Sequence, residues 1–126
     1  MSGRSDANSG PTMALIARGD LKLSTGKWMA QAGHAAVSAT MMAKKSQPRL
    51  VERWQASGAR KIALKVDDEA EMLRLAGEAK KAGIVAYVVR DAGHTEVEAN
   101  TATVLAIGPA PRRSIDGLCG GLGLFN

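Results

Sequence analysis

The sequence predicts an α/β domain in which a mixed β-sheet is layered with helices. Short apolar or alternating runs, typical of strands, take turns with helical patterns along the chain. The last two strand-like runs are joined by a loop too short for a crossover helix, which indicates an antiparallel pair in the sheet. The 126 residues suit one domain, and a hydrophobic content of 45% is enough for one packed core.

The chain opens with residues that are small and polar. We expect residues 1–12 to form a flexible tail before a single domain over residues 13–126. The apolar run MALIAR at 13–18 predicts a buried strand. After a polar loop, residues 27–45 hold one glycine, no proline and many alanines, and therefore favour a helix.

A second, shorter helix is expected next. Ser46 is a candidate N-cap, Pro48 suits the first turn, and Gly58 is expected to end the helix. The alternating run KIALKV at 61–66 then predicts the second strand.

The third helical pattern has charges that complement the helix dipole. Acidic residues crowd its start at 67–71, and Lys80 and Lys81 lie at its end. Gly83 is the expected C′ residue. The continuous apolar run at 84–89 predicts a central strand.

The final third of the chain returns to the sheet. A polar loop over 90–101 leads to a fourth strand at 103–107, which Gly108-Pro109 is expected to break. Residues 112–118 favour a last short helix before a glycine-rich tail.

Charge is distributed unevenly within a formal net charge of +5. Residues 1–66 hold 11 lysines and arginines against 3 acids, and residues 67–126 hold 6 against 9. The acid-free block between Asp20 and Glu52 could hold a polyanion or be an ordinary basic surface.

Several classes of protein are excluded or disfavoured by composition. No apolar run approaches the roughly 20 residues of a membrane span, and the first dozen residues lack the apolar region of a secretory signal. Cys119 is the only cysteine, which excludes an internal disulfide and a multi-cysteine zinc site. We therefore expect a reducing, cytoplasmic setting with no membrane partner.

Most polar side chains of the helix predicted at 27–45 lie in one line. The spacing i, i+4, i+7 and i+11 places four of them on one face: Lys27, Gln31, His34 and Ser38. Lys27 is also near the helix N-terminus, where free N–H groups favour an anion. This polar stripe could bind a phosphate through Lys27 and act on a polar bond through His34, or it could be a solvated face.

A second polar cluster directly follows the apolar run at 84–89. It contains Arg90, Asp91, Gly93 and Thr95. Ligands collect at the carboxyl ends of parallel strands, so Asp91 is a candidate for orienting a cation or polarising a water. Thr95 can donate a hydrogen bond, and Gly93 permits close approach. The alternative is a polar turn closed by an Asx cap.

Four stretches of the chain form a specific pattern: GDLKLSTGKWMAQAGHAAVSA, KIALKVDDEAEM, VVRDAGHTEVEANTATVLAIGPAP and GGLGLF. Together they resemble the archaeal and eukaryotic (type 2) peptidyl-tRNA hydrolase family, and the similarity covers about residues 13–125. The chain departs from the family pattern at His94, Gly123 and Phe125.

The resemblance implies a three-layer α/β/α sandwich with a four-stranded mixed sheet, and a homodimer. It implies hydrolysis of the ester between a peptide and the 3′-terminal ribose of tRNA, which recycles tRNA after ribosomal drop-off. The expected catalytic residues are Lys27, His34, Asp91 and Thr95. Gln31, Ser38, Gly93 and Thr103 are expected to bind substrate, with Arg90 from the polar cluster and, from their charge, Lys22, Lys44 and Lys45. Contacts to phosphate carry little sequence information, so many tRNAs would be accepted.

An ester of this kind is labile, so direct attack by water is the expected mechanism. Asp91 or His34 would be the general base and Lys27 would stabilise the oxyanion. No cofactor and no metal are expected, since two histidines lack the H-E-x-x-H pattern. Two alternatives stay open: a non-catalytic RNA-binding module that uses the same basic face, and a hydrolase for another small ester or amide.

Overall fold

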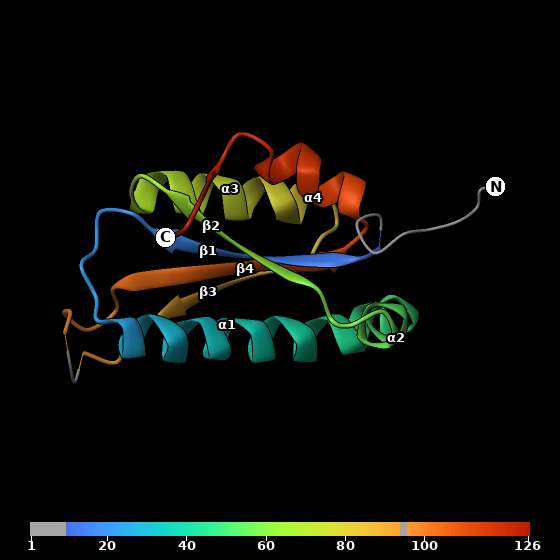
Figure 1. Ribbon diagram of the computed structural model, residues 1–126, viewed down its shortest axis with the longest axis horizontal. Helices are drawn as coiled ribbons and strands as arrows, with labels where there is room; N and C mark the ends of the chain where they lie inside the picture. The colour runs from blue at the N-terminus through green and yellow to red at the C-terminus, as the bar shows by residue number, and fades with distance from the viewer. Residues whose placement is uncertain (1–9, 94–95) are drawn as a thin grey trace.

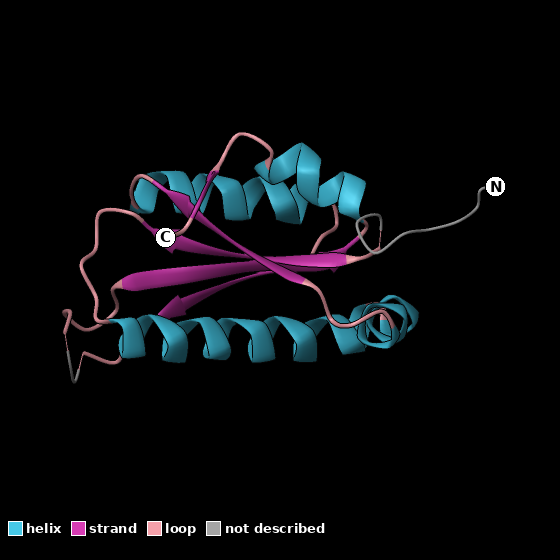
Figure 2. Ribbon diagram, in the orientation of Figure 1, coloured by secondary structure: helices cyan, strands magenta, loops and turns pink. Residues whose placement is uncertain are grey.

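A five-stranded mixed sheet lies between two layers of helices in the computed structural model, which describes residues 10–93 and 96–126 (Figures 1 and 2). The strands are β1 (Thr12–Arg18), β2 (Lys61–Val66), β3 (Ala86–Arg90), β4 (Ala102–Ala110) and β5 (Gly123–Leu124). The helices are α1 (Thr25–Ser46), α2 (Pro48–Ala56), α3 (Glu69–Lys81) and α4 (Arg112–Cys119). The expected alternation of strands and helices is confirmed.

The sheet has the strand order β3-β4-β1-β2-β5. β1 and β2 are parallel, while β4 lies antiparallel between β1 and β3, and β5 is antiparallel to β2. Every residue of β4 is buried, because this strand has a neighbour on each side and helices over both faces. Because β4 is antiparallel to both β1 and β3, the strands β1, β2 and β3 all run in one direction, as their helical connections predict.

The helices α1 and α2 cover one face of the sheet, and α3 and α4 cover the other (Figure 1). On the first face, Met13 and Val104 pack with Ala35 and Trp54. On the second face, a larger core forms from buried residues of the sheet, α3 and α4, among them Ile16, Leu75, Ile107 and Ile115. These two cores establish the expected three-layer sandwich, because each sheet face must be covered by an apolar helix stripe.

The long helix α1 has a clear start and a small-residue face. The Ser24 side chain caps it by accepting the Lys27 N–H at 3.2 Å. Its buried residues include Ala35, Ala39 and Ala43, which recur every fourth position. Small side chains on this face let the helix lie close to the sheet.

Two strand predictions at the end of the chain are wrong. The sheet has five strands instead of four, because Gly123 and Leu124 pair with β2 and the Phe125 N–H donates to Ala63 O. Gly108-Pro109 does not end β4: the Gly108 N–H donates to Val85 O, and Ala110 pairs with Thr12. A register shift in the β1–β4 pair absorbs the irregular geometry there.

Two local predictions are also corrected. β3 is an edge strand, whereas its continuous apolar sequence predicted a central one. The apolar run reflects the helix layers on both sides: Val88 faces the α3 core and Val89 the α1 core. Ser46 is the last residue of α1, and Gln47 precedes α2 without a side-chain cap bond.

At the N-terminal end, β1 begins at Thr12, one residue before the expected strand. Most of the expected tail, residues 1–9, lies outside the described residues. Within the described part of the chain, none of the helices combines the length and hydrophobicity that a membrane span requires.

Candidate active site

The polar stripe of α1 faces a cavity of about 480 Å³. All four stripe residues line it: Lys27, Gln31, His34 and Ser38. The opposite wall comes from β3 and the residues after it: Tyr87, Val89, Arg90, Asp91 and Ala92. The prediction that these four side chains share one face of the helix is therefore confirmed, and residues of the two polar clusters line the same cavity.

The closest contact in the cavity joins the two predicted clusters. Lys27 Nζ lies 2.5 Å from Asp91 Oδ1, and the Lys27 and Asp91 side chains are only 15% and 4% exposed. Charges this far from water interact strongly, because the local dielectric is lower than in bulk solvent. A buried pair is also costly to break, since the remaining charge would lack its partner.

The Asp91 carboxylate has a second fixed contact. Its Oδ2 accepts the Gly93 N–H at 2.8 Å, which is an Asx turn. The Asp91 main chain donates to Thr101 O and accepts from the Asn100 N–H. The alternative expected from spacing, an Asx-capped turn, is therefore present, and the same carboxylate also contacts Lys27.

Gly93 cannot readily be replaced at this turn. Its φ is +86°, and a Cβ at this position would lie 2.6 Å from the main chain of Ala99. The turn therefore needs glycine both for its backbone conformation and for close packing.

A hydrogen-bonded chain lies beneath the stripe. Gln31 Nε2 donates to Thr103 Oγ1 at 2.7 Å, and the Thr103 hydroxyl donates to Val89 O at 3.3 Å. Gln31 is 3% exposed and Thr103 is completely buried. This chain connects α1 to β4 and β3 at the base of the cavity.

The loop before β4 also holds the start of α1. Glu96 accepts the Ser24 N–H at 2.7 Å and the Ser24 hydroxyl at 2.6 Å. These hydrogen bonds stabilise the carboxylate, and they lower the pKa of Glu96 below its usual value. The contact links the cap of α1 to the loop that follows Asp91.

Some predicted site residues lie elsewhere. Lys22 is exposed in the loop before α1 and does not line the cavity. Lys44 and Lys45 lie in the last turn of α1, roughly 25 Å along the helix from Lys27. Thr95 lies outside the described residues.

Sequence reasoning missed three lining residues and one supporting contact. Tyr87 and Val89 lie four and two residues before Asp91, on β3, so the period-two spacing of a strand could have identified them. Ala92 also lines the cavity. No local pattern indicated the contact between Glu96 and Ser24, which joins residues 72 positions apart.

Metal ligands and a cysteine thiol are other groups that could supply chemistry in the described residues. Over residues 10–93 and 96–126, no group of three or more His, Cys, Asp or Glu side chains could hold a metal ion. Cys119 is buried, and burial raises its pKa to about 11, so the thiol is protonated at neutral pH.

The fold and the site define an α/β sandwich protein with a buried lysine–carboxylate pair at the head of an open cavity. Comparison with known proteins identifies the family within this class. A family model described as Peptidyl-tRNA hydrolase PTH2 matches residues 11–125, so the chain belongs to this family. The resemblance expected from the four sequence stretches is confirmed.

Individual relatives are similar over most of this chain. It is 39% identical to the peptidyl-tRNA hydrolase of Methanocaldococcus jannaschii over 90% of its own length and 98% of that protein. It is 46% identical to that of Methanopyrus kandleri, over 88% and 95%. Identity to the probable peptidyl-tRNA hydrolase 2 of Drosophila melanogaster is 44%, over 90% of this chain but 61% of that protein. These names support an enzyme and do not support the alternative of a non-catalytic RNA-binding module.

Proposed function

We propose that this chain hydrolyses the ester between a peptide and the 3′-terminal ribose of tRNA. The observation that carries the proposal is the Lys27–Asp91 pair at the head of the cavity. It brings a cation and a carboxylate together where an ester could reach both. Family membership supplies the substrate class.

The proposed reaction is direct attack by water. Water adds to the ester carbonyl, and Asp91 orients it and accepts its proton. Lys27 stabilises the negative charge that develops on the carbonyl oxygen. The bond to the ribose then breaks, the ribose hydroxyl takes the proton, and free peptide and tRNA leave.

His34 is the second candidate for the base. Its side chain lines the same cavity from α1, about two turns beyond Lys27 and one turn beyond Gln31. A pH–rate profile separates the two candidates: with Asp91 as base, His34→Asn keeps the wild-type acid limb, and with His34 as base that limb disappears.

The remaining polar residues have proposed roles in holding substrate. Ser38 and Arg90 line the cavity and are placed to contact the peptide or the terminal ribose. Gln31 and Thr103 hold α1 against β4 at the base of the cavity through their buried hydrogen bond. Gly93 shapes the Asp91 turn. Thr95 is included from the family resemblance, as a hydrogen-bond donor to substrate.

A turnover assay tests the function. Release of tRNA from an N-acetylaminoacyl-tRNA should fall about 10²–10³-fold in Lys27→Met and about 10²–10⁴-fold in Asp91→Asn. Lys80→Met, which removes an exposed lysine on α3, is the matched control and should retain activity.

Two outcomes would contradict this scheme. Wild-type rates in both site variants, with folding intact by circular dichroism, would remove the pair from catalysis. Loss of wild-type turnover in EDTA would contradict attack by water without a metal.

Three further expectations stay predictions: one domain from residue 13, a cytoplasmic location and a homodimer. The dimer is the most direct to test, by light scattering over a hundredfold range of concentration. A constant monomer mass across that range would contradict it.

A further inference from the structure

We propose that the peptide part of the substrate docks as an extended strand along the outer edge of β3. This inference rests on the proposed function and names how the same site recognises peptide. It would add a strand to the sheet through main-chain hydrogen bonds, which depend little on side-chain identity.

β3 has a free side in the described sheet. Its only strand neighbour there is β4, so it forms one edge of the order β3-β4-β1-β2-β5. A strand edge presents N–H and C=O groups that can pair with another chain. Edges are commonly protected by lysine, proline or very short strands, yet β3 has five residues and the sequence AYVVR.

The register indicates which groups face outward. Val85 O accepts the Gly108 N–H of β4 at 2.8 Å. In an antiparallel pair, every second residue of a strand forms main-chain hydrogen bonds with the neighbouring strand. Counting from Val85, the register therefore directs the N–H and C=O groups of Tyr87 and Val89 toward β4. Ala86 and Val88 therefore direct their N–H and C=O groups away from the sheet.

This edge is continuous with the reaction cavity. Tyr87 and Val89 line the cavity from β3, Asp91 lines it directly after the strand ends, and α1 forms the facing wall. Between Lys27 and Lys44, α1 contains no Asp, Glu, Lys or Arg. A wall without formal charge suits a neutral peptide better than the phosphate backbone of tRNA.

The chemistry of the ester sets the direction of the docked peptide. Its C-terminal carbonyl is the one joined to ribose, so it must lie beside Asp91 and Lys27. The peptide then extends from Arg90 toward Ala86 as its residues are counted back from the ester. Because β3 itself runs toward Asp91, the peptide would lie parallel to β3.

The opposite edge of the sheet does not offer the same site. β5 contains two residues, Gly123 and Leu124, and pairs with β2. It lies at the far side of the sheet from β3 and the cavity.

Peptide length gives the first test. KM is measured for tRNA esters of N-acetylalanine and of acetylated di-, tri- and hexa-alanine. KM should fall roughly tenfold from one residue to three, through added main-chain bonds, and then level off because β3 is short. N-methylation of the inner peptide nitrogens of the tri-alanine ester, one nitrogen at a time, should reverse the gain at alternating positions only.

A variant pair tests the protein side of the same contact. Val88→Pro removes an outward N–H, and Val88→Ala shortens the side chain but keeps that N–H. Proline is tolerated at such edge positions. KM for the tri-alanine ester should be several-fold higher in Val88→Pro than in Val88→Ala, and this difference should vanish for the N-acetylalanine ester.

The outcomes separate this inference from the proposed function. If no ester is hydrolysed, the proposed function fails. If all esters are hydrolysed with a KM that is independent of length and of N-methylation, the docking inference fails and the hydrolase stands. Main-chain docking would also be overturned if the fall of KM with peptide length changed with the type of side chain but not with N-methylation.

Discussion

Asp91 has three separate tasks that one small side chain and its peptide group can perform together. Its main chain closes the turn with Thr101 and Asn100. One carboxylate oxygen accepts from Gly93 and the other contacts Lys27. A carboxylate this buried needs such partners, because burial of an isolated charge is unfavourable. The same contacts hold it in one orientation toward the cavity.

The buried pair of Gln31 and Thr103 gives a prediction about stability. Thr103→Val is nearly isosteric but leaves the Gln31 amide without this acceptor, so the free energy of unfolding should fall by about 1–3 kcal/mol. Urea unfolding measures the change. The double variant Gln31→Met/Thr103→Val should recover part of the loss.

Thr101→Val is the control for this substitution. It removes a hydroxyl that bonds Glu98 O at an exposed contact, so its effect should stay within about 0.5 kcal/mol. Equal losses for Thr101→Val and Thr103→Val would contradict the importance of the buried contact.

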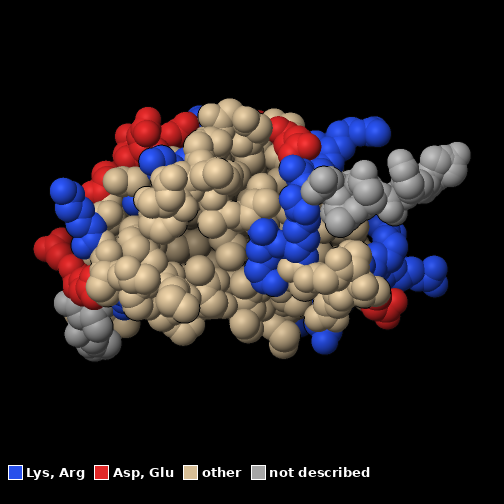
Figure 3. All heavy atoms as spheres, viewed as in Figure 1, with Lys and Arg blue, Asp and Glu red and all other residues tan. Residues whose placement is uncertain are grey.

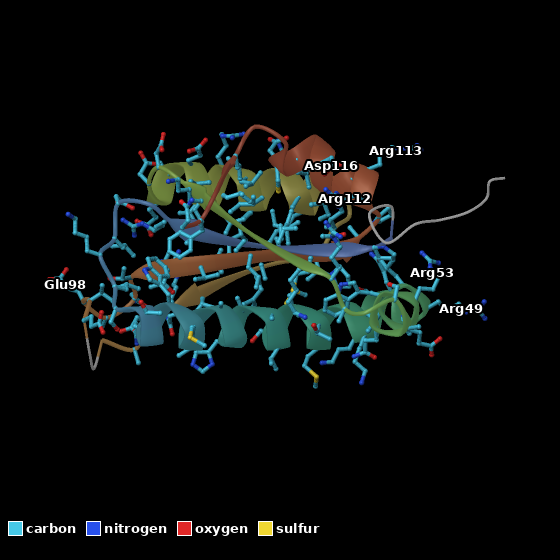
Figure 4. All side chains as sticks on the ribbon, viewed as in Figure 1. Arg49, Arg53, Glu98, Arg112, Arg113 and Asp116 are labelled. Carbon is cyan, nitrogen blue, oxygen red and sulfur yellow. The ribbon has the colours of Figure 1, made fainter. Side chains whose placement is uncertain are left out.

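The helix α1 and the loop before β4 act together to form the site. The loop carries Glu96, which holds Ser24, and Ser24 caps the helix that carries Lys27 (Figure 4 labels Glu98 in the same loop). The loop begins at Asp91, so both ends of the ion pair depend on one segment. Through these contacts, one loop positions both Lys27 and Asp91.

The Glu96–Ser24 contact should depend on pH. The pKa of Glu96 is lowered from 4.5, so the contact contributes stability above about pH 4.5 and loses it as the pH falls through the lower, folded value. The Ser24 amide proton, followed by NMR, should move upfield over that acidic range. In Glu96→Gln this titration should be absent.

A different midpoint would count against this assignment. A Ser24 amide that titrates above pH 4.5, or that still titrates in Glu96→Gln, would indicate that another acid controls the cap.

In the whole molecule, the proposed reaction site lies far from the basic end formed by α2 and the end of α1. The cavity lies at the N-terminal end of α1, while Lys44, Lys45, Arg49 and Arg53 belong to the end of α1 and to α2. Figure 3 shows Lys and Arg side chains gathered over the α2 end, where Figure 4 labels Arg49 and Arg53. A distance of roughly 25 Å between Lys27 and Lys44 suits a substrate as long as tRNA.

Salt dependence tests the proposed tRNA contact. Replacing Lys44 and Lys45 with serine should flatten the slope of log KM against log salt by between about one and two. Each phosphate contact that is lost reduces the number of counterions released when tRNA binds. The matched control replaces Lys80 and Lys81 of α3, the same charge change on the opposite layer. Equal flattening in both double variants would exclude a specific contact at Lys44 and Lys45.

Much of the architecture follows from local sequence. Helix and strand patterns placed β2 at its observed bounds, and Gly83 adopts the positive φ expected of a C′ residue. Lys27, Gln31, His34 and Ser38 share one face because helical periodicity is a local property. The family could also be recognised, since its motifs are contiguous stretches.

Other features depend on contacts between distant segments. The apolar run of β3 predicts burial but not a position in the sheet, because helix layers and neighbouring strands bury a residue equally well. β5 has two residues and no pattern of its own, and it exists because β2 offers a free edge.

The site divides along the same line. Helical spacing was enough to predict Lys27 as a site residue, and the position directly after an apolar strand was enough to predict Asp91, since both are properties of nearby positions in the chain. Their contact, the Glu96–Ser24 cap and the β3 edge beside the cavity arise only when β4 inserts between β3 and β1. Strand order is set by the packing of the whole sheet, and short-range patterns carry no information about it.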